Sequence, residues 1–250
     1  MKNSLIALLG IVVISASGCR KDEEEAANVP TVNTVWVHML HEVSGSEMVY
    51  NQRIYETPAG NPYEVRHLEY FISDFKLLDS KGNWISVNSE PYLINPEKER
   101  ITTLLAQVPV GSYQGISCMI GIPDVKNYKG YLTNTLENVN MSWPEVIGGG
   151  YHFMKFEGNY LDQDAGWIGY TVHLGTDPEH ALGMQSVNVI KDIKFSISEV
   201  SNNITLVMDM NEWFESPHIF DFNEYNYTMA IDSLMKVISE NGENCLTFKN

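Results

Sequence analysis

Short runs rich in β-branched and aromatic residues alternate with clusters of Gly, Pro, Asn and Asp along most of the chain. Runs of this length and composition, bounded by turn residues, predict β-strands. No internal repeat and no long helical period interrupts them before the C-terminal quarter. We expect strands over residues 34–43, 65–78, 84–87, 92–94, 115–122, 150–158, 169–174, 190–200, 203–208 and 245–248. Their spacing is typical of a sandwich or barrel, and we predict an all-β fold, an antiparallel β-sandwich.

One segment near the C-terminus has a different period. From Tyr227 to Ser239 the apolar residues recur at helical spacing, with polar residues on the opposite side. Asn241 and Gly242 then supply a helix stop. The pattern predicts a short C-terminal helix, and the polar stretch 130–140 is expected to form a loop or a short helix.

The first 18 residues read as a targeting signal. Lys2 provides a positive start, an apolar run follows, and Ala16-Ser17-Gly18 forms a small-residue cleavage site directly before Cys19. We therefore expect a lipoprotein signal peptide over 1–18 and lipidation of Cys19, with an ordinary secretory signal or a membrane anchor as alternatives.

The acidic run 19–30 has the composition of a solvated tether. It resembles the surface-export signal of Bacteroidetes lipoproteins, which implies an outer-membrane lipoprotein facing the periplasm or the exterior. The folded domain is expected over 31–250.

Charge and cysteine content narrow the function further. The net charge of −16 argues against nucleic-acid binding, which needs a basic surface. An exported protein folds in an oxidising compartment, so Cys118 and Cys245 could form a disulfide or remain two buried thiols.

No nucleophile elbow, phosphate-binding loop, His-Glu-x-x-His motif or dinucleotide fingerprint occurs, which disfavours an enzyme. Histidines are the more promising residues, because imidazole is a ligand for copper, zinc and nickel.

Strand alternation assigns the histidines to faces. His41 shares a face with Met39, whereas His38 lies on the opposite face of the same strand. Residues 143–175 contribute His152, expected to share a face with Met154, and His173 on the next strand. If these strands are neighbours, His41, His152 and His173 could ligate one ion, and a methionine sulfur would favour Cu(I). The alternative is that each histidine is a hydrogen-bonded structural residue.

Several segments together resemble the MbnP-like family of secreted copper-binding proteins. They are 41–45 (His-Glu-Val-Ser-Gly), 55–63, 68–77, 108–117, 120–124, 141–143 (Met-Ser-Trp), 150–158 (Gly-Tyr-His-Phe-Met-Lys-Phe-Glu-Gly) and 173–175 (His-Leu-Gly). The resemblance implies a secreted β-sandwich that binds copper, with zinc left open as the metal. Some members carry a tryptophan oxidised to kynurenine by a di-haem peroxidase-like partner, and Trp143 is the matching candidate. Members often have a second tryptophan two residues later, where this chain has Glu145.

We therefore expect a lipid-anchored, non-enzymatic copper-binding protein that serves copper acquisition, storage or handling. The expected ligands are His41 and His173, then His152, with His38 as an outer or alternative ligand. The competing hypothesis is a surface module without metal that binds glycan or protein through exposed aromatic residues. Its candidate residues are Trp84, Trp167 and Trp213.

Overall fold

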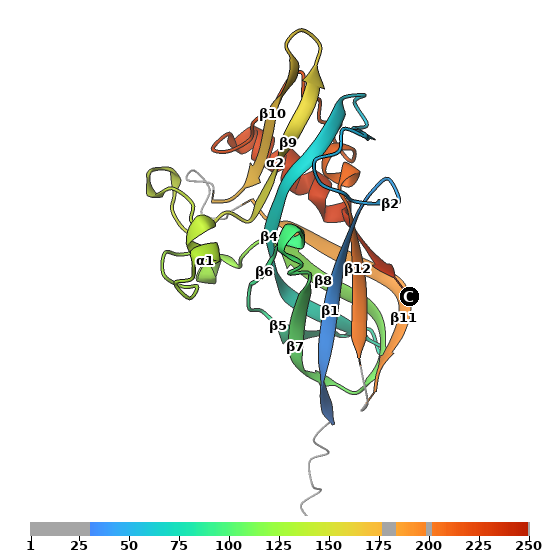
Figure 1. The fold of residues 1–250 in the computed structure, drawn as a ribbon. Coiled ribbons are helices and arrows are strands. Elements are labelled where there is room, and N and C mark those ends of the chain that lie inside the picture. The colour runs from blue at the N-terminus through green and yellow to red at the C-terminus, as the bar shows by residue number, and fades with distance from the viewer. Residues whose placement is uncertain (1–30, 177–183, 199–201, 250) are drawn as a thin grey trace, which may run out of the picture. The chain divides into compact units, whose positions relative to one another are not determined.

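The computed structural model of the protein describes residues 31–176, 184–198 and 202–249. The predicted signal peptide, Cys19, the tether and His180 lie outside these ranges. The described chain is an all-β domain with two mainly antiparallel sheets, so the predicted sandwich is confirmed (Figure 1).

The first sheet is organised around β1. Its strands, in the order β13-β12-β1-β2 with β7 also paired to β1, are β1 (Val32–Val43), β2 (Ser46–Glu47), β7 (Thr102–Pro109), β12 (Asn203–Asp209) and β13 (Leu246–Lys249). The pairing of β1 with β12 is parallel, unlike the antiparallel pairing expected throughout. Buried and exposed residues alternate along β1, as the sequence predicted. Strand β7 was missed by the sequence analysis.

The second sheet is organised around the 18-residue strand β4 (Pro62–Asp79). Its main order is β10-β9-β4-β8-β11, and β3, β5 and β6 also pair with β4. The bounds of these strands are β3 (Tyr55–Glu56), β5 (Trp84–Asn88), β6 (Tyr92–Ile94), β8 (Gly111–Ile120), β9 (Met154–Asp162), β10 (Gly166–Leu174) and β11 (Ser186–Ile197). The first half of β4 pairs with β9 and the second half with β8. Strand β4 is buried along most of its length, and it connects the β9–β10 hairpin to β8 and β11 in the same sheet.

Aromatic side chains pack the core beneath this hairpin. Tyr170 of β10 stacks on Phe222 with ring centroids 4.5 Å apart, and Phe214 packs against both Phe156 of β9 and Phe222. Such rings bury a large apolar area and prefer offset-stacked or edge-to-face pairs. This packing fixes which face of β9 and β10 is turned away from the core.

The C-terminal helix is confirmed, with shifted bounds. It is α2 (Asp232–Asn241) and begins five residues later than predicted. The residues before it lie along β10, where Tyr227 forms a parallel bridge with Thr171 and the Asn226 carbonyl and Thr228 amide hydrogen-bond to the Thr171 backbone, so they cannot begin the helix. A second short helix, α1 (Leu136–Asn140), lies in the polar stretch 130–140.

The remaining helical turns are the 3-10 segments η1 (Pro96–Lys98), η2 (Asp124–Lys126), η3 (Glu145–Ile147), η4 (Asn211–Phe214) and η5 (Gly242–Asn244). No helix in the described ranges has both the length and the apolar character to cross a membrane.

Of the two alternatives left open for Cys118 and Cys245, the structure shows two free thiols. Cys118 and Cys245 are separate buried thiols on either side of Asn188, which pairs with Cys118 across the sheet and accepts from the Cys245 sulfur at 3.8 Å. Burial raises the pKa of the Cys118 thiol to about 12 and also raises the pKa of Cys245, so both stay protonated. The structure therefore adopts the alternative of two unreactive thiols.

Candidate metal centre

His152 and His173 are brought together, and they form the centre of the candidate site. Their ring centroids lie 5.0 Å apart with the planes at 87°. His173 is near the end of β10, and His152 lies just before β9. Both residues are buried, at 6% and 7% exposure.

His173 is held by one nitrogen and presents the other. Its Nε2 lies 2.7 Å from the Glu157 carboxylate of the neighbouring strand. A carboxylate accepts, so Nε2 carries the proton, and this hydrogen bond is the main cause that lowers the pKa of Glu157. The Nδ1 atom is buried and has no hydrogen-bond partner. Because a buried polar atom without a partner is costly, this nitrogen is the clearest indication of a ligand-binding position.

His152 has the complementary arrangement. Its Nδ1 lies 3.2 Å from the carbonyl oxygen of Met141, which can only accept, so Nδ1 carries the proton and Nε2 carries the lone pair. The pKa of His152 is lowered to about 3, first by burial and then by the nearby His173 and Lys155. The ring is therefore neutral at pH 7, the state in which imidazole binds metals.

The sequence placed His152 on the wrong face. The alternation rule predicted that His152 shares a strand face with Met154, whose side chain is in the core. The strand begins only at Met154, and the backbone bends at Phe153, where it bonds to both β10 and β4. Because the bend breaks the two-residue period, the His152 ring instead reaches His173 on the outer face.

Trp143 packs against the His152 side of the candidate site. Its ring centroid is 4.6 Å from that of His152, and its Nε1 donates to the Ile147 carbonyl at 2.8 Å. Gly175 permits this packing, because a Cβ there would lie 2.3 Å from the indole. The turn before His152 runs through Gly150 at φ +79°, where a Cβ would also meet Asn127 at 2.4 Å. The glycines of this stretch thus provide close packing and left-handed backbone.

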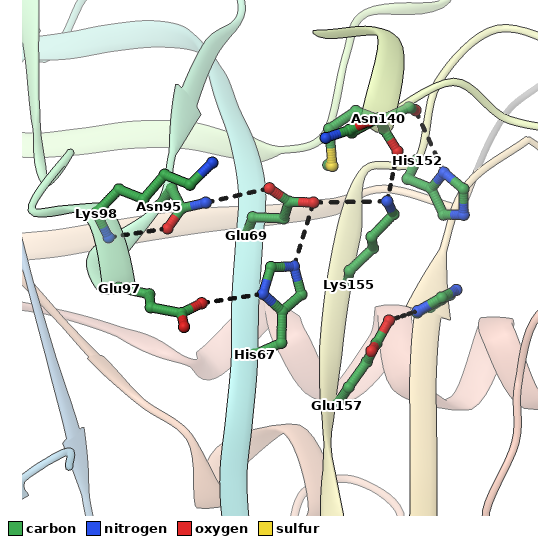
Figure 2. Close-up of polar contacts among 11 residues, drawn as sticks. His67, Glu69, Asn95, Glu97, Lys98, Asn140, His152, Lys155 and Glu157 are labelled. Atoms are coloured by element: carbon green, nitrogen blue, oxygen red, sulfur yellow. Dashed lines mark hydrogen bonds and ion pairs between the residues drawn. The ribbon is translucent and has the colours of Figure 1, made fainter. Parts of the chain in front are cut away.

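A polar network continues from the site across the same face of the sheet (Figure 2). Glu69 of β4 contacts His67 at 3.2 Å, Lys155 of β9 at 3.5 Å and the Asn95 amide at 3.2 Å. Glu97 of η1 contacts the other nitrogen of His67 at 3.3 Å. These residues were not predicted from the sequence, although polar side chains that alternate with core residues on β4 and β9 were the available signal.

His41 lies on the other side of this sheet. Its Nε2 is 2.9 Å from the hydroxyl of Tyr70, a fully buried core residue next to Glu69 on β4. Successive strand residues face opposite ways, so the sheet separates His41 from the His152–His173 pair. The predicted joint site that included His41 is therefore wrong.

His38 also lies apart from the pair. It is on the outer face of β1 beside exposed Trp36, and its Nδ1 is 3.1 Å from the Thr102 hydroxyl. Among the described residues, no three His, Cys, Asp or Glu side chains gather closely enough to ligate one ion. The candidate centre is accordingly a two-imidazole site.

The aromatic platform of the competing hypothesis is not formed either. Trp213 is completely buried, and the Arg53 guanidinium lies 4.2 Å from the ring centroid of Trp167. Only Trp84, at 39% exposure, remains open among the three candidates.

The fold and the paired imidazoles define a two-sheet β-domain with a candidate metal centre at one end of a hairpin. The sequence profile of the MbnP family matches residues 32–232, and the chain belongs to this family. Among solved structures, MbnP from Methylosinus trichosporium is similar in fold, with a TM-score of 0.54 and 14% sequence identity. The match covers 76% of this chain and 80% of that one. A comparison with curated proteins found no match.

Proposed function

We propose that this protein binds copper between His152 Nε2 and His173 Nδ1, as a non-enzymatic, lipid-anchored protein outside the cytoplasm. The observation that carries the proposal is the state of the two imidazoles. Each has one nitrogen that donates to an oxygen acceptor, so the other nitrogen carries the lone pair. A ligating histidine characteristically donates its second N–H to a carboxylate or a backbone carbonyl, as Glu157 and Met141 allow here.

The donor set favours copper over zinc. Structural zinc sites are almost always four-coordinate, and catalytic ones have three protein ligands. Among the described residues two imidazoles meet here, and monovalent copper accepts two nitrogen donors. Membership in the MbnP family, which the sequence resemblance links to copper, supports the same metal. When bound, copper would supply a redox-active centre, while the protein would orient the rings and exclude water from them.

Trp143 is the residue that we propose is oxidised to kynurenine by a di-haem peroxidase-like partner. It packs against His152 and also lines a surface cavity of about 590 Å³, together with Leu132, Val139 and Tyr151. The cavity offers a route to the indole, although the side chain itself is 2% exposed. Peptide mass spectrometry of protein from the native host should find kynurenine at Trp143 and unmodified tryptophan at Trp84.

The metal proposal is tested by titrating purified apoprotein with Cu(I) without oxygen, in competition with a chromogenic chelator. We expect His173→Ala and His152→Ala each to weaken binding at this site by at least about 100-fold, since half of the donor set is removed. The matched control is His218→Ala, which removes another carboxylate-paired histidine that contacts Glu240 at 2.6 Å. Wild-type copper affinity in both site variants would overturn the proposal.

The anchor is tested separately. Cys19→Ser should move the protein from the membrane to the soluble fraction and abolish labelling by a radioactive fatty acid. Unchanged membrane association and labelling would exclude lipidation at Cys19.

A further inference from the structure

A cavity of about 490 Å³ lies at the edge of β1. Strand β7 stops pairing with β1 at His38, and the Met39 amide then donates to the Ile101 carbonyl. Pairing with β2 begins at Glu42. The cavity opens where neither strand covers β1, and its wall includes Met39, His41, Met48 and Tyr50.

Three soft donors line this cavity. Met39 and His41 are two residues apart on β1 and therefore face the same way. Met48 is positioned by its amide, which donates to the His41 carbonyl at 3.0 Å. All three are buried, at 0%, 9% and 8% exposure. Thioether sulfur selects soft ions such as Cu(I) and does not suit magnesium or calcium.

His41 is arranged as a ligand. Tyr70 is fully buried, and burial raises the pKa of its phenol well above the ordinary value, so the group stays neutral. The His41 Nε2–H can donate to this phenol oxygen, 2.9 Å away, and the Nδ1 lone pair is then available. No described residue hydrogen-bonds to Nδ1.

The cavity wall carries two carboxylates, Glu42 and Glu47, and one cation, Lys249, so its formal charge is negative. Glu42 and Glu47 lie directly opposite each other across the β1–β2 pair, and both line the cavity. Like charges at such positions destabilise a sheet. A bound cation would offset this repulsion.

We propose that the cavity lined by Met39, His41 and Met48 is a second binding site for Cu(I), with two thioethers and one imidazole as donors. It shares no ligand with the His152–His173 pair and does not depend on copper binding there. The core of the second sheet separates the two sites. The protein would therefore hold two ions in different donor sets, one nitrogen-only and one sulfur-rich.

The test counts ions and locates them. Apoprotein with ¹³C-labelled methionine methyls is titrated without oxygen, using Cu(I) and its redox-inert analogue Ag(I). The methyl signals of Met39 and Met48 should shift on saturation, while Met235 of α2, which is equally buried but does not line the cavity, should not. The double variant Met39→Leu/Met48→Leu, which nearly conserves volume, should bind one ion fewer than wild type.

The outcomes separate the two proposals. His173→Ala should leave the Met39 and Met48 shifts intact, whereas the double methionine variant should keep the His173-dependent ion. If the double variant does not fold, the single variant Met48→Leu provides the same comparison near the surface. Unshifted Met39 and Met48 signals at saturating Ag(I), or an unchanged ion count in the leucine variants, would overturn the second site without affecting the first.

Discussion

Replacing Glu157 by glutamine is the most informative single change at the paired imidazoles. The substitution keeps the size of the side chain and removes the negative charge that lies 2.7 Å from His173 Nε2. It leaves both proposed ligand nitrogens in place. We expect weaker copper binding, because the carboxylate fixes the tautomer and increases the basicity of the ring.

The size of the effect follows from the exposure of the pair. Removing such an outer partner costs about 10- to 100-fold in metal affinity, or roughly 1.4–2.8 kcal/mol. The Glu157 side chain is 37% exposed, so solvent screens part of its charge. We therefore expect a loss of about tenfold for Glu157→Gln, at the low end of that range, and a larger loss for Glu157→Ala.

The assay is competitive Cu(I) titration at fixed ionic strength, with Glu240→Gln as the matched control. Glu240 forms a similar short contact with His218 and is 40% exposed, so both variants lose one comparable charge. The control should keep wild-type affinity. Equal losses in the two variants would mean that only overall charge matters, and no loss in Glu157→Gln would refute the orienting role.

Two further predictions concern stability. Gly175→Ala should lower the free energy of unfolding by about 1–3 kcal/mol through overpacking and change Trp143 emission, because the new Cβ would lie 2.3 Å from the indole. Gly169→Ala, where the nearest atom is 3.8 Å away, should cost less in the same denaturant titration, and equal losses would contradict the packing argument. The hydrogen bond to Glu69 raises the pKa of His67 above 6.5, so the folded state holds the proton more tightly than the unfolded state. The contribution of protonated His67 to the free energy of unfolding is present below pH 6.5 and is lost as pH rises through the folded pKa. The variant His67→Gln should therefore lose less stability between pH 6 and pH 9 than wild type in urea titrations. An identical pH dependence in the two proteins would refute this prediction.

Local patterns determined much of the architecture. Alternation on β1 correctly placed His41 with buried Met39 and His38 on the outer face, because side-chain direction in a regular strand depends only on residue parity. Helical spacing found α2, although its start was set by the pairing of Tyr227 and Thr228 with β10. That contact joins residues more than fifty positions apart, which a local period does not encode.

The sequence by itself thus determined an all-β domain and identified His41, His173, His152 and His38 as candidate ligands. Tertiary structure alone decided that His152 and His173 meet, that Glu157 and Met141 each accept from one of their nitrogens, and that His41 lies beyond the sheet. The physical reason is that parity fixes a side chain's face only within a regular strand and says nothing about which strands become neighbours. The bend at Phe153 and the long-range pairing of β4 with β9 supplied that information. Residues 143–175 consequently hold both imidazoles of the proposed copper site, while His41 lines a separate cavity together with Met39 and Met48.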